Sequence, residues 1–234
     1  MIATNRDIFF KSYTSQFNSN LKQEQIDGLN SILDAFASDP LLESLQQAAY
    51  MLATTWHETG QTFQPICERG NKDYFRKYNG KLGNQQPEDG YLYRGRGYVQ
   101  LTFKDNYKKA SEKLNRLTAR YPQGVDLVTC PDDTLKPQIA ADILLIGMRE
   151  GWFTGKKLSD YIKTEKCDYY NARRIINALD RADKLAEAAK KFETVLQQAL
   201  TSTTASSSSS SHTRAEKPED HSELWDAAYG KEQK

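Results

Sequence analysis

Apolar residues recur at helical spacing over most of the first two hundred positions. In residues 21–37 they fall three and four positions apart and give one apolar face, and Pro40 follows as a stop. Residues 41–59 show a second apolar stripe that runs to Trp56, and Gly60 follows at a plausible C-cap position. The same period returns in residues 105–114, 137–153, 156–162 and 171–200. The pattern therefore predicts a mainly helical domain.

Residues 61–104 interrupt this pattern. They lack a long helical period and contain six well-spread glycines: Gly70, Gly80, Gly83, Gly90, Gly95 and Gly97. Glycine-punctuated polar sequence is typical of loops and short strands. We therefore expect a mainly α (α+β) fold in which an α-rich domain faces a small glycine-rich β or loop lobe across a cleft.

The composition changes near Thr201. Residues 201–220, TSTTASSSSSSHTRAEKPED, are too polar to offset the entropy of ordering them. Farther on, Leu224, Trp225 and Tyr229 could form a short amphipathic turn, either as part of an unordered end or as a docking peptide. We expect residues 1–200 to form the folded domain and residues 201–234 to form a Ser-rich, disordered tail.

Charge and hydropathy exclude several classes of protein. The chain has 32 Lys and Arg against 31 Asp and Glu, so no strong electrostatic field favours the binding of nucleic acid. No apolar run approaches the roughly 20 residues that span a bilayer, and the N-terminus lacks a signal-peptide apolar region. We expect synthesis in the cytoplasm and no integral membrane segment. Three widely spaced cysteines predict core positions in a reducing compartment, and neither a disulfide framework nor a zinc site: Cys67, Cys130 and Cys167.

Candidate chemistry gathers in residues 54–70 and 93–107. The first stretch carries two carboxylates, Glu58 and Glu68, and the second carries a hydroxyl and amides. Cleavage of a glycosidic bond needs one acid to protonate the leaving oxygen and another group to activate or hold water. Glu58 falls at a predicted helix C-terminus beside Trp56, and both surroundings disfavour an ionised carboxylate, as suits an acid. Residues 54–60 alone fit a solvated carboxylate at a helix end as well as they fit a catalytic acid.

The HET sequence also admits other chemistry. A zinc peptidase motif HExxH needs a second histidine at position 61, where the chain has Gln61. The remaining histidines lie in the tail, so a metal site is poorly supported. A cysteine amidase that pairs Cys67 with His57 is formally possible, but nothing marks the thiol as activated. We expect His57 to pack or hydrogen-bond beside the cleft.

Four motifs carry a resemblance to a known family. TTWHETG, GRGYVQLTFKDNY, FTGKKLSDY and NARRIIN occur in this order along the chain. In this respect residues 8–200 resemble the chitinase-class members of glycoside hydrolase family 19. They are most similar to its short bacterial and bacteriophage forms, which include endolysins that degrade peptidoglycan. The resemblance implies a lysozyme-like fold, catalysis without a cofactor, and a polysaccharide substrate.

The resemblance also implies roles for particular residues. Glu58 matches the general acid, Glu68 matches the general base, and Thr102 matches the hydroxyl that helps to hold the attacking water. Arg69 follows Glu68 where short members often have an aromatic residue, and it could pair with the carboxylate. Such a base, acting through water, predicts an inverting reaction with the two carboxyl groups roughly 6.5–9.5 Å apart.

The substrate-binding residues follow from the same motifs. Gln100, Asn106 and Asn177 match amides that bind substrate, His57 lies beside the acid, and Tyr98 could stack on a sugar face. The three residues after Asn177 lack the glycine that commonly follows in the family, so the local backbone is unlike the family pattern. Two arginines, at positions 173 and 174, either form a solvated helical face or supply one partner to a cleft carboxylate.

The sequence thus predicts a monomeric, inverting glycoside hydrolase that cleaves β-1,4 bonds beside N-acetylated amino sugars, as in peptidoglycan. It would reach the cell wall after lysis or by dedicated export. A true chitinase is the first alternative. Alternatives of another class are an inactive sugar-binding module or partner protein, which retention of both carboxylates disfavours, and the amidase that depends on Cys67.

Overall fold

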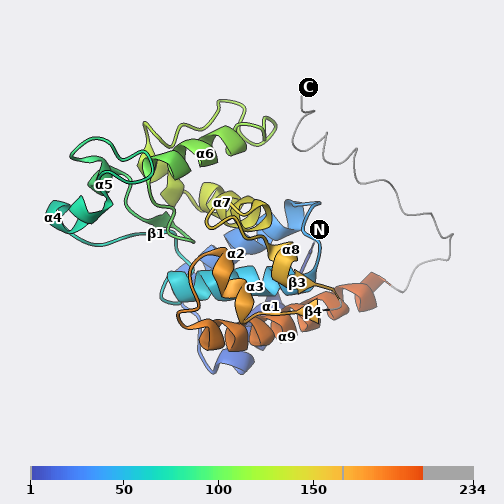
Figure 1. Cartoon of the computed structure of the whole chain (residues 1–234). Helices are drawn as coiled ribbons and strands as arrows, with labels where there is room; N and C mark the ends of the chain where they lie inside the picture. Colours follow the sequence, from blue (N-terminus) through green and yellow to red (C-terminus); the bar gives the residue numbers. More distant parts are fainter. Residues whose placement is uncertain (1, 165, 208–234) are drawn as a thin grey trace.

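The structure, a computed structural model, describes residues 2–164 and 166–207, with side chains through residue 200. A helical body is built from α1, α2, α3, α6, α7 and α9. Their bounds are Arg6–Phe17, Gln23–Ser38, Leu45–Glu58, Lys104–Leu114, Pro137–Glu150 and Ala182–Ser207. α3 and α1 pack along α9, and α2 packs on α7 (Figure 1). Within the described residues, no helix has the length and apolar content needed to cross a bilayer.

A small lobe projects from this body, with α4 and α5 at the left of Figure 1. Its elements are β1 (Ile66–Cys67), α4 (Lys72–Phe75), the 3-10 helix η1 (Arg76–Tyr78), α5 (Asp89–Leu92) and β2 (Arg96–Gly97). β1 and β2 pair antiparallel, with Cys67 opposite Arg96. Short elements joined by turns are what the glycine-rich stretch predicts, so this part of the fold prediction is confirmed.

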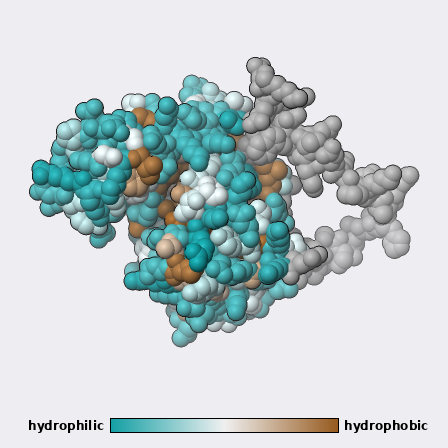
Figure 2. All heavy atoms as spheres, in the orientation of Figure 1, coloured by the Kyte–Doolittle hydropathy of each residue, from teal (hydrophilic) through white to brown (hydrophobic). Residues whose placement is uncertain are grey.

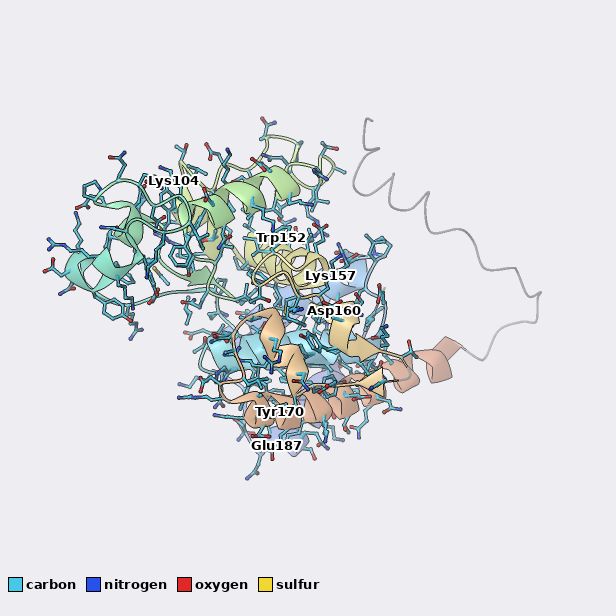
Figure 3. The ribbon with its side chains drawn as sticks, in the orientation of Figure 1. Lys104, Trp152, Lys157, Asp160, Tyr170 and Glu187 are labelled. Carbon is cyan, nitrogen blue, oxygen red and sulfur yellow. The ribbon has the colours of Figure 1, made fainter. Side chains whose placement is uncertain are left out.

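The remaining elements lie in the body. They are η2 (Pro131–Leu135), α8 (Leu158–Tyr161), the paired strands β3 (Ile162–Lys163) and β4 (Lys166–Cys167), and η3 (Asn171–Ile175). A capping bond from the Lys157 N–H to Asp160 Oδ2, at 2.9 Å, starts α8, and the two residues lie close together in Figure 3. This segment leads the chain to η3, which reaches the end of α3.

The core surrounds α3. Residues 48–55 of this helix are buried at every position, so α3 is covered on all sides. The α1–α9 contact contains aromatic rings. Tyr13 stacks on Phe17 with 4.5 Å between the ring centroids, and the ring centroid of Phe192 lies 4.7 Å from that of Phe17. Aromatic pairs of this kind add about 0.5–1.5 kcal/mol each beyond their buried area. The C-terminal turn of α3 is therefore held in a rigid setting.

Two helical predictions need correction. α1 is a helix, although its weak apolar pattern does not predict one; the Asn5 side chain caps it by accepting from the Ile8 N–H at 3.2 Å. Residues 171–200 are not one helix, because η3 ends at Ile175 and α9 begins at Ala182. Between them Arg181 has φ of +56°, a left-handed conformation that no helix contains.

The cysteines also differ from expectation. Cys130 and Cys167 are exposed, and Cys67 is half-buried, so none is a core residue. All three are free thiols. Cys130 directly precedes η2 and Cys167 lies in the two-residue strand β4, and such short elements lack the apolar periodicity that identifies core positions.

Helix α9 extends to Ser207, seven residues beyond the predicted end of the domain. The rest of the predicted tail, including Leu224, Trp225 and Tyr229, lies outside the described residues. The division of the chain at residue 200 therefore stays a prediction.

Truncation after Leu200 tests that division. The Asn5 N–H donates to the Ala199 carbonyl at 3.2 Å, Ala199 is buried, and Leu200 still packs on the core. Because these contacts remain, we expect the melting temperature to change by less than about 2 °C. Activity on soluble oligosaccharides should also be retained. A larger fall on calorimetry would show that residues 201–234 stabilise the body.

Candidate active site

Glu58 stands on the last turn of α3, and the helix end is fixed by its own backbone. The Gln61 N–H donates to the Trp56 carbonyl at 2.7 Å, and the Gly60 N–H donates to the His57 carbonyl at 3.2 Å. Gly60 has φ of +58°, a conformation that glycine adopts without strain. These are the two bonds of a Schellman C-cap. The predicted cap at Gly60 is confirmed.

The carboxylate of Glu58 is paired with a buried arginine. Arg173 Nη1 lies 2.6 Å from Glu58 Oε1, and the two side chains are 2% and 18% exposed. Arg173 Nε also donates to the Asp180 carbonyl at 3.1 Å. Glu58 is therefore not a solvated helix-end carboxylate, and the alternative in which an arginine pairs with a cleft carboxylate is confirmed for Arg173. Arg174 is exposed.

The pairing leaves one carboxylate oxygen available. Arg173 binds Oε1, and no hydrogen-bond donor in the described part of the chain binds Oε2 of Glu58. The guanidinium compensates the negative charge of a carboxylate that is largely withdrawn from water. Glu58 is thus held at one oxygen and free at the other. Its surroundings include a buried cation, which differs from the sequence expectation that they disfavour an ionised carboxylate.

His57 lies beside this pair and is half-buried. Desolvation lowers the pKa of His57; Glu58 opposes the shift, and the Arg173 charge adds to it. The imidazole is therefore mainly neutral at pH 7. Its ring makes no hydrogen bond to Cys67, whose sulfur instead accepts from Arg94 Nε at 3.0 Å. The Cys–His pair of an amidase is not formed.

Glu68 follows β1 directly, and strand pairing positions it. The Glu68 N–H donates to the Gly95 carbonyl at 2.7 Å, and the Gly95 N–H donates back to Glu68 Oε2 at 3.2 Å. The Tyr78 hydroxyl donates to Oε1 at 3.1 Å. A Cβ at position 95 would lie 2.7 Å from Gln100 Oε1, so glycine permits this close approach. Two donors hold the carboxylate, which is 22% exposed.

The expected partner of Glu68 is wrong. Arg69 is exposed and forms no ion pair within the described residues. The nearby cation is Lys77, whose Nζ lies 4.0 Å from Glu68 Oε1. The chain therefore uses a residue nine positions away, on η1, rather than the sequence neighbour.

The turn at residues 100–103, QLTF, lies next to Glu68 and is fixed by hydrogen bonds. Gln100 Nε2 donates to the Ile66 carbonyl at 3.1 Å, Thr102 Oγ1 donates to the Gln100 carbonyl at 2.8 Å, and Asn106 Nδ2 donates to the Thr102 carbonyl at 2.7 Å. Gln100 and Phe103 have φ of +55° and +76°. Such conformations cost non-glycine residues of the order of 1–3 kcal/mol and cluster at functional sites. The donors fix the turn and leave the amide oxygens as acceptors.

Of the remaining predicted binding residues, Tyr98 differs from expectation, whereas nothing in the structure contradicts the role of Asn177. Tyr98 is fully buried, burial raises its pKa, and its hydroxyl has no hydrogen-bond partner among the described residues. It offers no ring face to a sugar, so the stacking role is wrong for this conformation. Asn177 is exposed, and its Oδ1 accepts from the Ala178 N–H at 2.8 Å. Asn177 follows η3 and so belongs to the same segment as Arg173.

The structure thus forms two clusters. The first cluster lies in the body and contains Glu58, His57, Arg173 and Asn177. The second cluster joins two lobe residues to the following turn and the start of α6: Glu68, Tyr78, Gln100, Thr102 and Asn106. No hydrogen bond joins the two clusters within the described residues. Hydrophobic residues show on the surface where the lobe meets the body, whereas the outer surface of the lobe is hydrophilic (Figure 2).

Sequence reasoning missed Tyr78, Lys77 and the close contact at Gly95. No apolar periodicity marks Lys77 or Tyr78, because η1 is only three residues long. The one available signal was the density of aromatic and basic residues in 72–78, which lies close in sequence to Glu68.

A pocket away from the motif residues is a poor candidate for the site. It lies between α2 and α7 and is lined by Ser38, Asp39, Arg120 and Asp142, among others. Arg120 pairs with Asp142 and donates to Ser38. Its charges are thus satisfied internally, and none of the motif residues lines it.

Comparison with known proteins gives a match at the level of structure. No family model and no curated protein matches the sequence. Chitinase C from Streptomyces griseus HUT6037 has a TM-score of 0.56 and 19% identity, over 82% of this chain and 77% of that chain. A bacterial family 19 chitinase has a TM-score of 0.50 and 21% identity, over 80% of this chain and 93% of that chain.

This chain has the fold of the family 19 chitinases. The predicted α-rich, lysozyme-like architecture with a small lobe is confirmed by these similarities. In this fold Glu58 ends α3 of the body and Glu68 follows β1 of the lobe.

Proposed function

We propose that the protein is an inverting glycoside hydrolase that cleaves β-1,4 bonds beside N-acetylated amino sugars. One observation carries the proposal: within a family 19 fold, two carboxylates are held in different ways. Glu58 pairs with a buried guanidinium, and Glu68 accepts from a hydroxyl and a backbone N–H. Two carboxyl groups with different surroundings are suited to the separate roles of acid and base.

Glu58 acts as the general acid. Its free oxygen, Oε2, donates a proton to the glycosidic oxygen as the bond breaks. Arg173 then stabilises the carboxylate that forms, through the bond to Oε1. Asn177 and neutral His57 lie on the same side and supply hydrogen bonds to sugar substituents.

Glu68 acts as the general base. It takes a proton from water, while the Tyr78 hydroxyl and the Gly95 N–H fix the orientation of the carboxylate. Thr102 donates its proton to the Gln100 carbonyl, so its oxygen is left to accept from the attacking water. Gln100 and Asn106 present their amide oxygens to N–H or O–H groups of the sugar.

The substrate that we propose is bacterial peptidoglycan, cleaved by an enzyme of endolysin type that acts as a monomer on the cell wall after lysis or dedicated export. Chitin is the alternative, and the names of the structural neighbours favour it. Mass spectrometry of products from purified sacculi and from chitin oligomers distinguishes the two. New reducing ends support a glycosidase and identify the terminal sugar; new amino groups alone would support an amidase and contradict the proposal.

Glu68→Ala tests the base. Without the carboxylate, water cleavage should fall by a factor of about 10²–10⁴, and azide should restore part of the activity by giving a glycosyl azide of inverted configuration. Glu88→Ala, which removes an exposed carboxylate from the same lobe, should retain activity. In the wild type, early anomeric proton spectra should show an α product from the β-linked substrate. A β product formed first would mean retention and would refute the role of Glu68.

A further inference from the structure

A row of side chains leads outward from the candidate base across the small lobe. The Tyr78 hydroxyl binds Glu68, Lys77 Nζ lies 4.8 Å from the Tyr78 ring centroid, and the same Nζ lies 3.5 Å from the Tyr74 ring centroid. Tyr74 is 49% exposed and the Lys77 side chain is 43% exposed. The ammonium group is therefore held beside Glu68 and remains open to solvent.

The charge of Lys77 is less neutralised than the charges of Lys72, Arg76 and Arg96 in the same lobe. Lys72 pairs with Glu88 at 2.5 Å, Arg76 pairs with Asp73 at 3.0 Å, and Arg96 pairs with Asp132 at 2.8 Å. Residues 68–96 contain seven Lys and Arg against four Asp and Glu, so the lobe carries a net positive charge. The only carboxylate near Lys77 in the described structure is Glu68, at 4.0 Å.

The aromatic neighbours keep this cation in place. Cation–π contacts with Tyr74 and Tyr78 restrict a side chain that would otherwise sample many rotamers. The interaction with Tyr74 raises the pKa of Lys77, so the ammonium stays protonated through the neutral range. A preorganised cation next to a glycan-cleaving carboxylate can bind an anionic substituent without first being ordered.

We propose that Lys77, held over Tyr74, binds a carboxylate carried by the glycan next to Glu68 and so selects acidic glycan over neutral chitin. The inference rests on the proposed glycoside hydrolase function and names its specificity residue. In peptidoglycan the carboxylate belongs either to the stem peptide or to the lactyl group of a sugar freed of its peptide. Chitin carries neither group.

The test measures one ratio: kcat/KM on soluble peptidoglycan oligomers divided by kcat/KM on the same oligomers with their carboxyl groups amidated. We expect the wild type to prefer the acidic form by about two- to fivefold, because an exposed charge pair contributes modestly. Added salt should reduce this preference. Oligomers with intact stem peptides and oligomers stripped of them, each with an amidated counterpart, show which carboxylate is bound.

Lys77→Met should bring the ratio close to one, and Lys77→Arg should keep most of the preference. Lys72→Met is the matched control, since it removes the same charge from the same lobe at a site already neutralised by Glu88, and it should leave the ratio unchanged. Unfolding curves of the variants should agree with the wild type within about 2 °C, since both lysines are exposed.

Three outcomes would overturn the inference: a wild-type ratio near one, an unchanged ratio in Lys77→Met, or an equal change in Lys72→Met. The unchanged ratio includes the case in which Lys77→Met loses the same factor on acidic and amidated oligomers, because the lysine would then act on Glu68 alone. If neither peptidoglycan nor chitin is cut, the proposed function itself fails. If glycan is cut without charge preference, only this inference fails.

Discussion

Glu58→Gln should lower kcat by a factor of the order of 10²–10⁴ and leave a folded protein. Glutamine has the size of the native residue, and its amide oxygen can still accept from Arg173, so the end of α3 keeps its shape. The amide cannot donate a proton to the leaving oxygen, and loss of a general acid has an effect of this size. Reducing-end assays on peptidoglycan and chitin oligomers measure the loss.

Glu187→Gln provides the matched control for that substitution. Glu187 is an exposed carboxylate on α9, labelled at the bottom of Figure 3, and it belongs to neither cluster of the site. Its replacement should leave kcat within twofold of the wild type, by the usual behaviour of surface substitutions. Wild-type turnover in Glu58→Gln would contradict the assignment of the acid.

Arg173→Met should destabilise the protein by about 3 kcal/mol, because it leaves the Glu58 carboxylate largely withdrawn from water and without its counter-charge. For a domain of this size, that corresponds to a fall in melting temperature of roughly 6–12 °C. Turnover should fall as well, since the carboxylate formed in the reaction loses its stabilising partner. Urea unfolding and kinetics on the folded variant separate the two effects.

Arg174→Met is the control for this second prediction. Arg174 is the next residue on η3 and is exposed, and within the described residues its side chain makes only a long bond to Asn171 Oδ1 at 3.4 Å. Its loss should change the free energy of unfolding by less than about 0.5 kcal/mol. The double variant Glu58→Gln/Arg173→Met should lose less stability than the two single variants together. Strict additivity would show that the ion pair does not couple the two residues.

The helices that the sequence predicts well are those with an apolar face against the core. α2, α3, α6 and α7 begin and end within a few residues of their predicted bounds, because burial of one face repeats every three to four positions. The sequence does not predict α1, because its few buried residues do not form a regular apolar face; Phe9 and Tyr13 are among them. The helix is stabilised by packing against α9, which is far away in the sequence.

The candidate carboxylates were accessible from the sequence, but their surroundings were not. Motifs identify Glu58 and Glu68, whereas ion pairs depend on which distant segment folds against them. Arg69 is adjacent to Glu68 along the chain and yet exposed, while Lys77 approaches from η1. Tyr98 shows the same limit, since its type suits sugar stacking but its position in the fold is interior.

The Glu58–Arg173 pair has a consequence for the order in which the protein gains activity during synthesis. The two residues are 115 positions apart, and the helix that covers α3, α9, is the last element of the body to emerge. In a ribosome-bound chain, Glu58 is therefore synthesised long before Arg173, which neutralises its charge. It is also synthesised long before α9 can cover α3. Domains fold as units once their chain is complete, so cleavage activity should arise in one step near the end of translation.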